Sequence, residues 1–442
     1  MKSKNICVLG IGKSGIAVAN LAVKLGYNVF VSDNSKKIEA NGLNQKIEVE
    51  IGEHSNKILN SDIIIKSPGI DSNIPILKKA REKKIKIISE LAFSLDFLKN
   101  LNYKKIIAIT GTNGKTTTTD LVSKIMMSTY KNLIVSGNIG SPLANDVFKV
   151  TKETYIIIEV SSYQLEDTPQ FKPNVSVLLN ITPDHFEHHK NMKLYIDAKK
   201  KVFINQKHND FTIINYDNRI CRKIIPEIKT KKIFFSKHTL KQGVFYNNGN
   251  IIIKIDDKHI VIKPTINILG RHNIDNILAA VATAHVVGGI KPKSIEKVIS
   301  NYECLEHRIE FVRILNGVSY YNDSKSTNVD STKVAVKSFK HNILLIMGGS
   351  DKYSSFNTLK NIVKKRVKFV FLIGASSNKI RKDLIGTTVL FNCKTMENAI
   401  NKIYKIAKKG DVVLLSPACA SFDQFRNFEE RGIFFKQLVN KL

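Results

Sequence analysis

Cysteine is scarce in this 442-residue sequence, and its five cysteines lie far apart. They are Cys7, Cys221, Cys304, Cys393 and Cys419, and no two form a C-x-x-C pair. A disulfide framework or a cysteine zinc site would need closely spaced pairs, so the sequence argues against both. We therefore expect a protein of the reducing cytoplasm.

Long apolar runs are missing as well. No stretch approaches the roughly 20 apolar residues of a membrane-spanning helix, so we expect no transmembrane segment. The N-terminal MKSKNICVLGIGKSG begins with basic residues, but Lys13 interrupts its apolar stretch and no small-residue cleavage pattern follows, which argues against a signal peptide. With 43% hydrophobic and 24% charged residues, the composition is typical of a soluble globular protein. The length suggests two or three domains.

Acidic residues are outnumbered, with 38 Asp and Glu against 69 Lys and Arg, for a formal net charge of +31. Such a charge would favour nucleic-acid binding if it were concentrated. The lysines are instead scattered, and neither a basic tract interleaved with aromatics nor a helix-turn-helix or RNP-like pattern occurs. We expect solvated lysine-rich faces and no specific nucleic-acid partner. The positive field would also favour an anionic small substrate.

Strand-like runs alternate with helical patterns, which is typical of parallel α/β sheets. The runs are NICVLG, YIIIEV, VSVLLN, NILLIM, VKFVFLIG and VVLLSP. Residues 211–263 hold shorter β-like runs and turn signals such as NNGN, which suggest an antiparallel insertion or a sheet edge. Candidate boundaries near Phe93 and Val298 divide the chain into three α/β domains. The predicted domains are residues 1–93, 94–298 and 299–442.

The first predicted domain opens with a glycine-rich loop. Gly10, Gly12 and Gly15 match G-x-G-x-x-G between a strand and a helix, and Asp33 ends the next strand, VFVSD. This pattern is typical of a dinucleotide-dependent dehydrogenase, although a purely structural strand-turn-helix could also carry it. A hydride-transfer enzyme has no use for a second phosphate loop, so a third interpretation is a loop that binds the diphosphate of a nucleotide-linked substrate.

That second loop is ITGTNGKTTTT, a shortened variant of the phosphate-binding pattern G-x-x-x-x-G-K-[ST]. Gly114, Lys115 and Thr116 supply its second half, whereas Ile109 stands at the first glycine position and Gly111 follows two residues later. The strand-like KKIIAIT precedes it, and the helix-compatible TTTTDLVSKIMM follows. The context favours a nucleoside triphosphate over an ordinary glycine turn.

Polar residues follow the next two predicted strands. YIIIE ends in Glu159, and NITPDHFEHH places Asn180, Asp184 and His185 at the same sheet edge. A carboxylate beside Thr116 is what a magnesium site in a phosphate-loop enzyme needs, because Mg²⁺ prefers oxygen ligands. Zinc at the HFEHH histidines is disfavoured, since the spacing is not that of a tetrahedral ligand set and no cysteine lies near.

A series of strings in fixed order covers most of the chain and resembles the Mur ligase family. The strings are GTNGKTT, EVSSYQLE, NITPDH, YIDAKKKVF, LGRHNIDN, LEHRIE, NDSKSTN, GGSDK and SPACASFDQFRNFEERG. The last string and SPGI at residues 67–70 resemble the member that adds D-glutamate more than the sisters that add L-alanine, the diamino acid or the terminal dipeptide. The D-N-P-R string typical of the diamino-acid-adding sister does not occur. Folylpolyglutamate synthase shares the ATP-domain pattern but not the terminal motifs.

The resemblance implies the fold and the reaction. It implies an α/β fold of three domains, with a Rossmann-like domain for the UDP-linked substrate (1–93), a central P-loop ATPase-like domain (94–298) and a Rossmann-like C-terminal domain for the amino acid (299–442). The implied reaction is ATP-dependent ligation of D-glutamate to UDP-N-acetylmuramoyl-L-alanine through an acyl phosphate. It would serve peptidoglycan precursor synthesis, and through it cell shape and division, and we expect a monomer. A sister ligase, an ATP-driven nucleic-acid-binding protein and a dehydrogenase remain alternatives.

The resemblance also assigns catalytic and metal-binding roles. The catalytic residues would be Lys115, His185 and Lys199, and Lys199 in YIDAK aligns with a lysine that the family carbamylates. We expect two Mg²⁺ ions, held by Thr116, Glu159, His185 and Lys199.

Substrate-binding roles are assigned in the same way. ATP is expected at Gly111, Thr112, Asn113, Gly114, Lys115, Thr116, Thr117, Asn273, Asn276, Arg308 and Asp323. The UDP-linked substrate is expected at Lys13, Ser14, Asp33, Ser67, Pro68, Gly69, Asn138 and Ser161. D-glutamate is expected at Lys352, Ser416 and Phe422.

Overall fold

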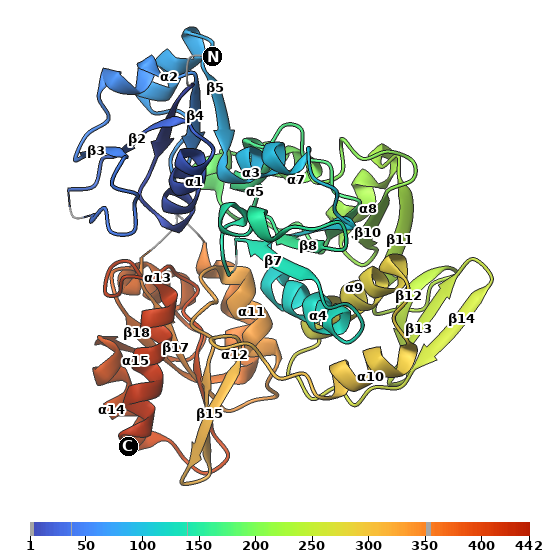
Figure 1. The fold of residues 1–442 in the computed structure, drawn as a ribbon. Helices are drawn as coiled ribbons and strands as arrows, with labels where there is room; N and C mark the ends of the chain where they lie inside the picture. Colours follow the sequence, from blue (N-terminus) through green and yellow to red (C-terminus); the bar gives the residue numbers. More distant parts are fainter. Residues whose placement is uncertain (1–3, 37, 139, 351–354) are drawn as a thin grey trace. The chain divides into compact units, whose positions relative to one another are not determined.

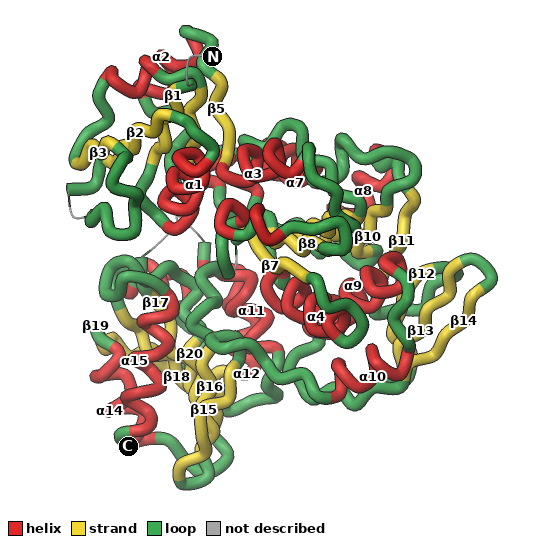
Figure 2. Tube along the Cα trace, viewed as in Figure 1, coloured by secondary structure: helices red, strands yellow, loops and turns green. Residues whose placement is uncertain are grey.

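The computed structural model describes residues 4–36, 38–138, 140–350 and 355–442. Strands and helices alternate along the chain (Figures 1 and 2), as the sequence predicts for an α/β protein. The chain forms two compact units. Unit 1 consists of Met1–Ile181, His188–Pro264 and Asn276–Val298, and unit 2 of Thr182–Glu187, Thr265–Asp275 and Ile299–Leu442.

The N-terminal part of unit 1 is a parallel sheet of strand order β3-β2-β1-β4-β5. The strands are β1 (Asn5–Leu9), β2 (Asn28–Asp33), β3 (Glu48–Ile51), β4 (Ile63–Lys66) and β5 (Lys86–Ser89). The accompanying helices are α1 (Lys13–Lys24), η1 (Asn56–Asn60), α2 (Pro75–Glu82) and α3 (Glu90–Leu98). β1 reads as an apolar run because all its residues after Asn5 are buried, as expected for a parallel strand covered on both faces.

A larger sheet of order β14-β13-β12-β11-β10-β9-β6-β8-β7 forms the rest of unit 1. Its strands are β6 (Lys105–Thr110), β7 (Leu133–Gly137), β8 (Tyr155–Glu159), β9 (Val175–Leu178), β10 (Phe211–Asn215), β11 (Lys231–Ser236), β12 (Gly243–Asn247), β13 (Asn250–Ile255) and β14 (Lys258–Ile262). The helical segments of this part of the chain are α4 (Lys115–Met127), η2 (Leu143–Asn145), η3 (Val147–Lys149), α5 (Ser162–Glu166), α6 (Phe186–His189), α7 (Met192–Lys200), α8 (Arg219–Ile224), η4 (Ile225–Glu227), α9 (His272–Val287) and α10 (Pro292–Ser300). Of these, α6, α9 and α10 belong only partly to unit 1. α4 packs against β6, β7 and β8 (Figure 1), and this contact fixes where the loop before α4 lies.

Unit 2 contains a sheet of order β15-β16-β20-β17-β18-β19, in which only the β15–β16 pair among the described strands is antiparallel. The strands are β15 (Glu310–Leu315), β16 (Val318–Asn322), β17 (Ile343–Gly348), β18 (Val367–Ile373), β19 (Val389–Lys394) and β20 (Val412–Leu415). The helices are α11 (Val329–Lys337), η5 (Phe356–Leu359), α12 (Lys360–Arg366), α13 (Ser377–Leu384), α14 (Met396–Ile406) and α15 (Phe428–Asn440). The order changes direction between β20 and β17, and crevices at such points are where open α/β sheets bind ligands.

One continuous apolar core runs through both sheets of unit 1. It includes Val18 and Leu98 beside the first sheet and Ile106 and Ile158 in the second. A buried carboxyl lies at the same junction: Glu90 accepts hydrogen bonds from Ala144 N at 2.8 Å and Ser94 Oγ at 3.1 Å. Burial raises the pKa of Glu90 to about 7.

Two predictions from the sequence can be compared with the fold. The antiparallel part of residues 211–263 covers β12 to β14, whereas β10 and β11 pair in parallel and extend the main sheet. The predicted domain boundaries at Phe93 and Val298 fall within α3 and α10, respectively. Every helix among the described residues is too short or too polar to span a bilayer.

Candidate active site

The central loop, residues 109–116, joins β6 to α4 in unit 1. Gly114 has φ of 86° and lies directly before Lys115, the first residue of α4. A Cβ atom there would lie 2.2 Å from Asn276 Oδ1, so the close approach of the Asn276 side chain requires glycine as much as the left-handed backbone does. The structure thus places the predicted nucleotide residue Asn276 against the loop.

Asn180 holds this loop from the end of β9. Its Oδ1 accepts a hydrogen bond from Asn113 N at 2.8 Å, and its Nδ2 donates to Asn113 O at 3.0 Å. Its backbone oxygen accepts from Thr112 N at 2.9 Å. Three hydrogen bonds from one residue therefore fix the middle of the loop.

Two lysine side chains converge on the carbonyl of Gly111. Lys115 Nζ donates to Gly111 O and Thr112 O, each at 2.9 Å, and Lys199 Nζ donates to Gly111 O at 2.9 Å. Lys199 is 1% exposed, and its Nζ lies 4.8 Å from the centre of the Tyr195 ring. The Tyr195 hydroxyl lies 3.0 Å from Thr112 Oγ1. The predicted catalytic residues Lys115 and Lys199 are thus brought together at the loop.

Glu159 ends β8, which pairs with β6 so that Glu159 lies opposite Ile109. Its Oε1 accepts a hydrogen bond from Asn138 Nδ2 at 2.9 Å. Its Oε2 is buried without a hydrogen-bond partner. A buried carboxylate oxygen without a partner is costly, and an oxygen-seeking cation would satisfy it. The residues present therefore fit the Mg²⁺ that the sequence predicts, with Glu159 and the buried Thr116 as its protein ligands.

Ser161 caps the N-terminus of α5. Its Oγ accepts a hydrogen bond from Gln164 N at 3.2 Å and lies 3.0 Å from Gln164 Oε1, while Gln164 Oε1 also accepts from Ser161 N. This capping box aligns the first turn of the helix directly after Glu159. A substrate contact by the Ser161 hydroxyl stays a prediction.

The N-terminal loop, residues 10–15, joins β1 to α1. Gly10 has φ of 95°, and a Cβ atom there would lie 2.8 Å from Ser67 Oγ. Ser67, Pro68 and Gly69 follow β4, and Ser67 Oγ donates to Gly10 O at 3.3 Å. The N-terminal loop and the SPGI segment therefore lie side by side at Gly10 and Ser67.

Asp33 braces the N-terminal loop with its carboxylate. Its Oδ2 accepts a hydrogen bond from Ile11 N at 2.8 Å, and its Oδ1 accepts from Ser35 N at 2.9 Å. Lys13 and Ser14 begin α1, with Lys13 exposed and Ser14 half-buried. Asp33 thus uses both oxygens on backbone amides of its own chain.

In unit 2 the predicted residues Arg308, Asp323 and Ser416 form one cluster. Asp323 is 4% exposed, and its carboxylate accepts hydrogen bonds from Ser416 Oγ at 2.7 Å and Ile309 N at 3.3 Å. Burial raises the pKa of Asp323 to about 6, although these hydrogen bonds and the charge of Arg308 act in the opposite direction. The Ser416 hydroxyl thus serves Asp323.

His185 belongs to the short segment Thr182–Glu187 of unit 2 and has φ of 57°, which is unusual for a non-glycine residue. Its Nε2 lies 3.5 Å from Asp184 Oδ2, and the same oxygen accepts a hydrogen bond from Asn328 Nδ2 at 2.9 Å. The metal-binding role predicted for His185 stays a prediction.

Three further predicted residues are not gathered at these clusters. Asn273 is buried and donates from Nδ2 to Leu269 O at 2.7 Å. Phe422 is 72% exposed. Lys352 lies outside the described residues. Their substrate roles stay predictions.

The sequence offered signals for three residues to which no role was assigned. Asn180 is a polar residue just beyond a strand end, and Tyr195 lies one helical turn before Lys199 on α7. Arg431, in the NFEERG string, is 1% exposed and donates to Ser324 O at 2.8 Å and Cys419 O at 3.1 Å. Arg431 thus ties two of the sequence strings together within unit 2.

Comparison with protein families matches the chain in three successive segments. Residues 4–89 match the Mur ligase MurD-like N-terminal domain, residues 109–284 the Mur ligase middle domain, and residues 307–419 the Mur ligase glutamate ligase domain.

Individual relatives agree with these matches. The chain is 43% identical to the UDP-N-acetylmuramoylalanine–D-glutamate ligase of Elusimicrobium minutum, over 100% of this chain and 98% of that protein. It is 40% identical to the ligase of the same name from Koribacter versatilis, over 100% and 98%. Among solved structures, the MurF ligase of Thermotoga maritima in complex with ADP has a TM-score of 0.63 at 16% identity, covering 100% of this chain and 96% of that one. At that identity the similarity concerns the fold alone.

Proposed function

The chain belongs to the Mur ligase family, and on that premise we propose that it joins D-glutamate to UDP-N-acetylmuramoyl-L-alanine at the expense of ATP, in peptidoglycan precursor synthesis. The observation that carries the proposal is the convergence of Lys115 and Lys199 on Gly111 O at the central loop. A dehydrogenase would have no use for this arrangement, whereas an enzyme that activates a carboxylate needs positive groups around a transferring phosphoryl group.

The reaction proceeds in two steps. An oxygen of the alanine carboxylate attacks the γ-phosphorus of ATP, and ADP leaves with the bonding electrons. The amine of D-glutamate then attacks the acyl carbon, phosphate leaves and the nitrogen loses a proton. Lys115 would follow the γ-phosphoryl group from the edge of the loop. Asn180, which already accepts the Thr112 and Asn113 amides, would hold the loop backbone in shape beside the remaining phosphates.

Two magnesium ions are part of the proposal. Thr116 and Glu159 would hold the first, and His185 and Lys199 the second. Bound magnesium would neutralise phosphate charge and align the phosphoryl group with the attacking carboxylate. We propose that Lys199 acts as its carbamate, which keeps one N–H for Gly111 O and offers oxygen atoms to the metal. A ¹³C carbamate resonance in ¹³C-bicarbonate that is present in the wild type and absent in Lys199→Arg would support this; its absence from the wild type would contradict it.

Each substrate portion is proposed to bind at a separate group of residues. The N-terminal loop with Ser67 would receive the UDP portion, Asn138 the muramoyl-alanine portion, and Lys352, Ser416 and Phe422 the D-glutamate. Because Ser416 is fully buried against Asp323, its part would be to fix the surrounding backbone. The proposal also includes a monomeric state and a cytoplasmic location. The five free cysteines support the location.

The test is phosphate release from ATP and Mg²⁺ with UDP-N-acetylmuramoyl-L-alanine, comparing D-glutamate, L-glutamate, D-alanine and a diamino acid. We expect release that requires both the UDP-linked substrate and D-glutamate. Equal release with another amino acid would contradict the substrate assignment. Release without any amino acid would leave only an ATP-hydrolysing enzyme.

A further inference from the structure

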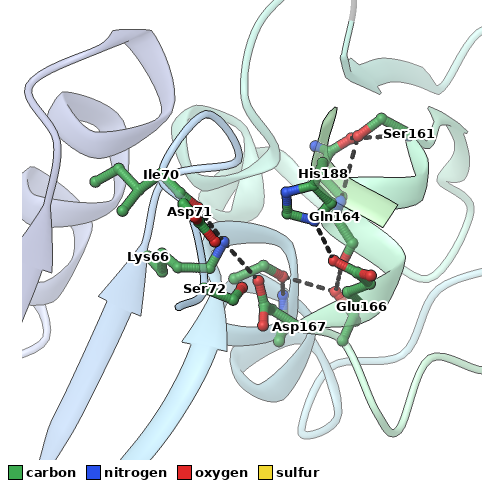
Figure 3. Close-up of polar contacts among 12 residues, drawn as sticks. Lys66, Ile70, Asp71, Ser72, Ser161, Gln164, Glu166, Asp167 and His188 are labelled. Carbon is green, nitrogen blue, oxygen red and sulfur yellow. Dashed lines mark hydrogen bonds and ion pairs between the residues drawn. The ribbon is translucent and has the colours of Figure 1, made fainter. Parts of the chain in front are cut away.

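Two histidines of α6 face a glutamate at the end of α5, within unit 1. His188 Nε2 lies 2.5 Å from Glu166 Oε2, and His189 Nδ1 lies 3.1 Å from Glu166 Oε1. Figure 3 shows the His188 ring directed at the Glu166 carboxylate. One donor atom from each of the three residues lies within 4.8 Å of the other two. The distances are short enough for one ion to reach all three with modest adjustment.

The donor set suits a transition metal better than magnesium. Zinc takes imidazole nitrogens at about 2.0–2.1 Å and carboxylate oxygens at about 2.0–2.2 Å, and two histidines with one glutamate form a known class of zinc site that leaves a position open. The sequence argued against zinc here because HFEHH alone lacks a suitable spacing. Folding supplies the missing ligand, since Glu166 comes from 22 residues before His188.

The second ring nitrogen of His189 is also held. His189 Nε2 lies 2.8 Å from Ser162 Oγ, and the His189 side chain is fully buried. A hydrogen bond to the far ring nitrogen fixes the tautomer and orientation of a metal-binding imidazole, and such contacts are a regular part of metal sites. The side chains of His188 and Glu166 remain 11% and 27% exposed, which leaves an entry path.

A cavity of about 450 Å³ opens beside the three residues. Arg81, Lys190 and Lys201 also line it, so water or a small anion would suit the position left open on a bound cation. The neighbouring Asp167 is paired with the buried Lys66 at 3.0 Å (Figure 3), and is therefore committed elsewhere. Glu166 is the carboxylate that faces the histidines.

A second cluster of histidine and glutamate side chains differs from the Glu166 cluster in one respect. In unit 2, Glu306, His307 and Glu310 also bring three donor atoms within 4.8 Å. There Lys436 Nζ already pairs with both glutamates. A lysine ammonium thus occupies the place of a cation there, whereas Lys201 Nζ donates at 2.9 Å to the backbone oxygen of Glu166 and not to its carboxylate.

The geometry points to a binding site for one divalent transition metal ion of the zinc class, formed by Glu166, His188 and His189 and separate from the predicted magnesium ligands Thr116 and Glu159.

The test is calorimetric titration of ZnCl₂ into the full chain with excess Mg²⁺ present, so that oxygen-rich sites are filled first. We compare the wild type with His188→Gln and Glu166→Gln, and with His208→Gln, which removes an exposed histidine, as the matched control. We expect one zinc equivalent in the wild type and in the control, and at least about tenfold weaker binding in the two ligand variants. Circular dichroism before zinc addition checks that each variant is folded.

Cobalt absorption tests the wild type alone, so its outcome does not depend on a variant that folds. Co²⁺ at two imidazoles and a carboxylate should give the intense visible bands of four- or five-coordinate cobalt, and zinc should displace it. No saturable zinc binding, unchanged affinity in a folded His188→Gln variant, or the weak spectrum of octahedral cobalt would each overturn the proposal.

Discussion

The two glycine-rich loops occupy equivalent places in their sheets, yet side chains of different charge hold them in place. Each follows a parallel strand, precedes a helix and contains a left-handed glycine, Gly10 with φ of 95° and Gly114 with φ of 86°. The N-terminal loop is held by the carboxylate of Asp33, which accepts from Ile11 N. The central loop is held by the neutral amide of Asn180.

This difference matters because the charge of the side chain that holds a loop affects which ligand the loop can accept. Two unit charges about 5 Å apart interact by about 3 kcal/mol at an effective dielectric constant of 20, so a carboxylate brace would oppose a triphosphate strongly. The central loop avoids this cost and adds Lys115 at its edge. The N-terminal loop instead gives the Ile11 amide to the Asp33 carboxylate, so this amide is not available to a phosphate.

The largest expected effect comes from removing the lysine at the edge of the central loop. Lys115→Ala should lower kcat for phosphate release by about 10³-fold, because the transferring phosphoryl group loses a positioned positive partner. Binding of the UDP-linked substrate should remain, since its loop is untouched. The control is Lys124→Ala on the same helix, which removes an exposed lysine that pairs with Asp120. Phosphate release at near wild-type rate in Lys115→Ala would mean that the central loop is not the site of phosphoryl transfer.

Glu159, the carboxylate at the end of β8, is expected to act by binding a metal ion. Glu159→Gln preserves an oxygen for Asn138 but removes the charge, so the Mg²⁺ concentration for half-maximal activity should rise by about 100-fold. Magnesium titrations of activity measure this. Glu153→Gln, an exposed carboxylate paired with Lys104 just before β8, is the control. An unchanged magnesium requirement would exclude Glu159 as a ligand.

Local sequence signals were enough to locate both loops, because a glycine between an apolar strand and a helix is a short-range pattern. Glu159 at a strand end was found from such a local pattern, whereas Lys199 was assigned through the family resemblance. The structure places Lys199 Nζ 2.9 Å from Gly111 O. The domain boundary near Phe93 stays a prediction, and one apolar core includes both Leu98 in α3 and Ile106 in β6.

The braces could not be read from the sequence. Asn180 meets Asn113 across 67 residues, and Asp33 meets Ile11 across 22. A local pattern shows that a polar residue follows a strand, but not which backbone group it will hold after folding. The same limit hid Glu166 as the partner of His188.

Replacing the neutral Asn180, which holds the central loop, by a negative residue should have a smaller but selective effect. Asn180→Asp adds a negative charge beside the phosphates and loses the hydrogen bond donated to Asn113 O, so the KM for ATP should rise by about 10-fold or more. The KM for the UDP-linked substrate should not change. Asn174→Asp is a close control, because Asn174 likewise accepts a backbone amide, from Ile106 at 2.8 Å, but at the opposite end of β9. Equal effects of the two substitutions would show that charge at the loop is unimportant.

The reciprocal exchange at the N-terminal loop should have the smallest effect. Asp33→Asn keeps one acceptor for Ile11 N but replaces a charge-assisted bond by a neutral one and leaves Ser35 N without its partner. A loss of about 1 kcal/mol corresponds to a rise of about fivefold in the KM for the UDP-linked substrate, with the KM for ATP unchanged. Asp62→Asn is the control, since Asp62 accepts the Asn5 amide at 2.8 Å at the amino end of the same sheet. If Asp33→Asn instead raised the KM for ATP, the two loops would not divide the substrates between them. A selective effect, opposite to that of Asn180→Asp, would show that each brace is matched to the ligand of its own loop.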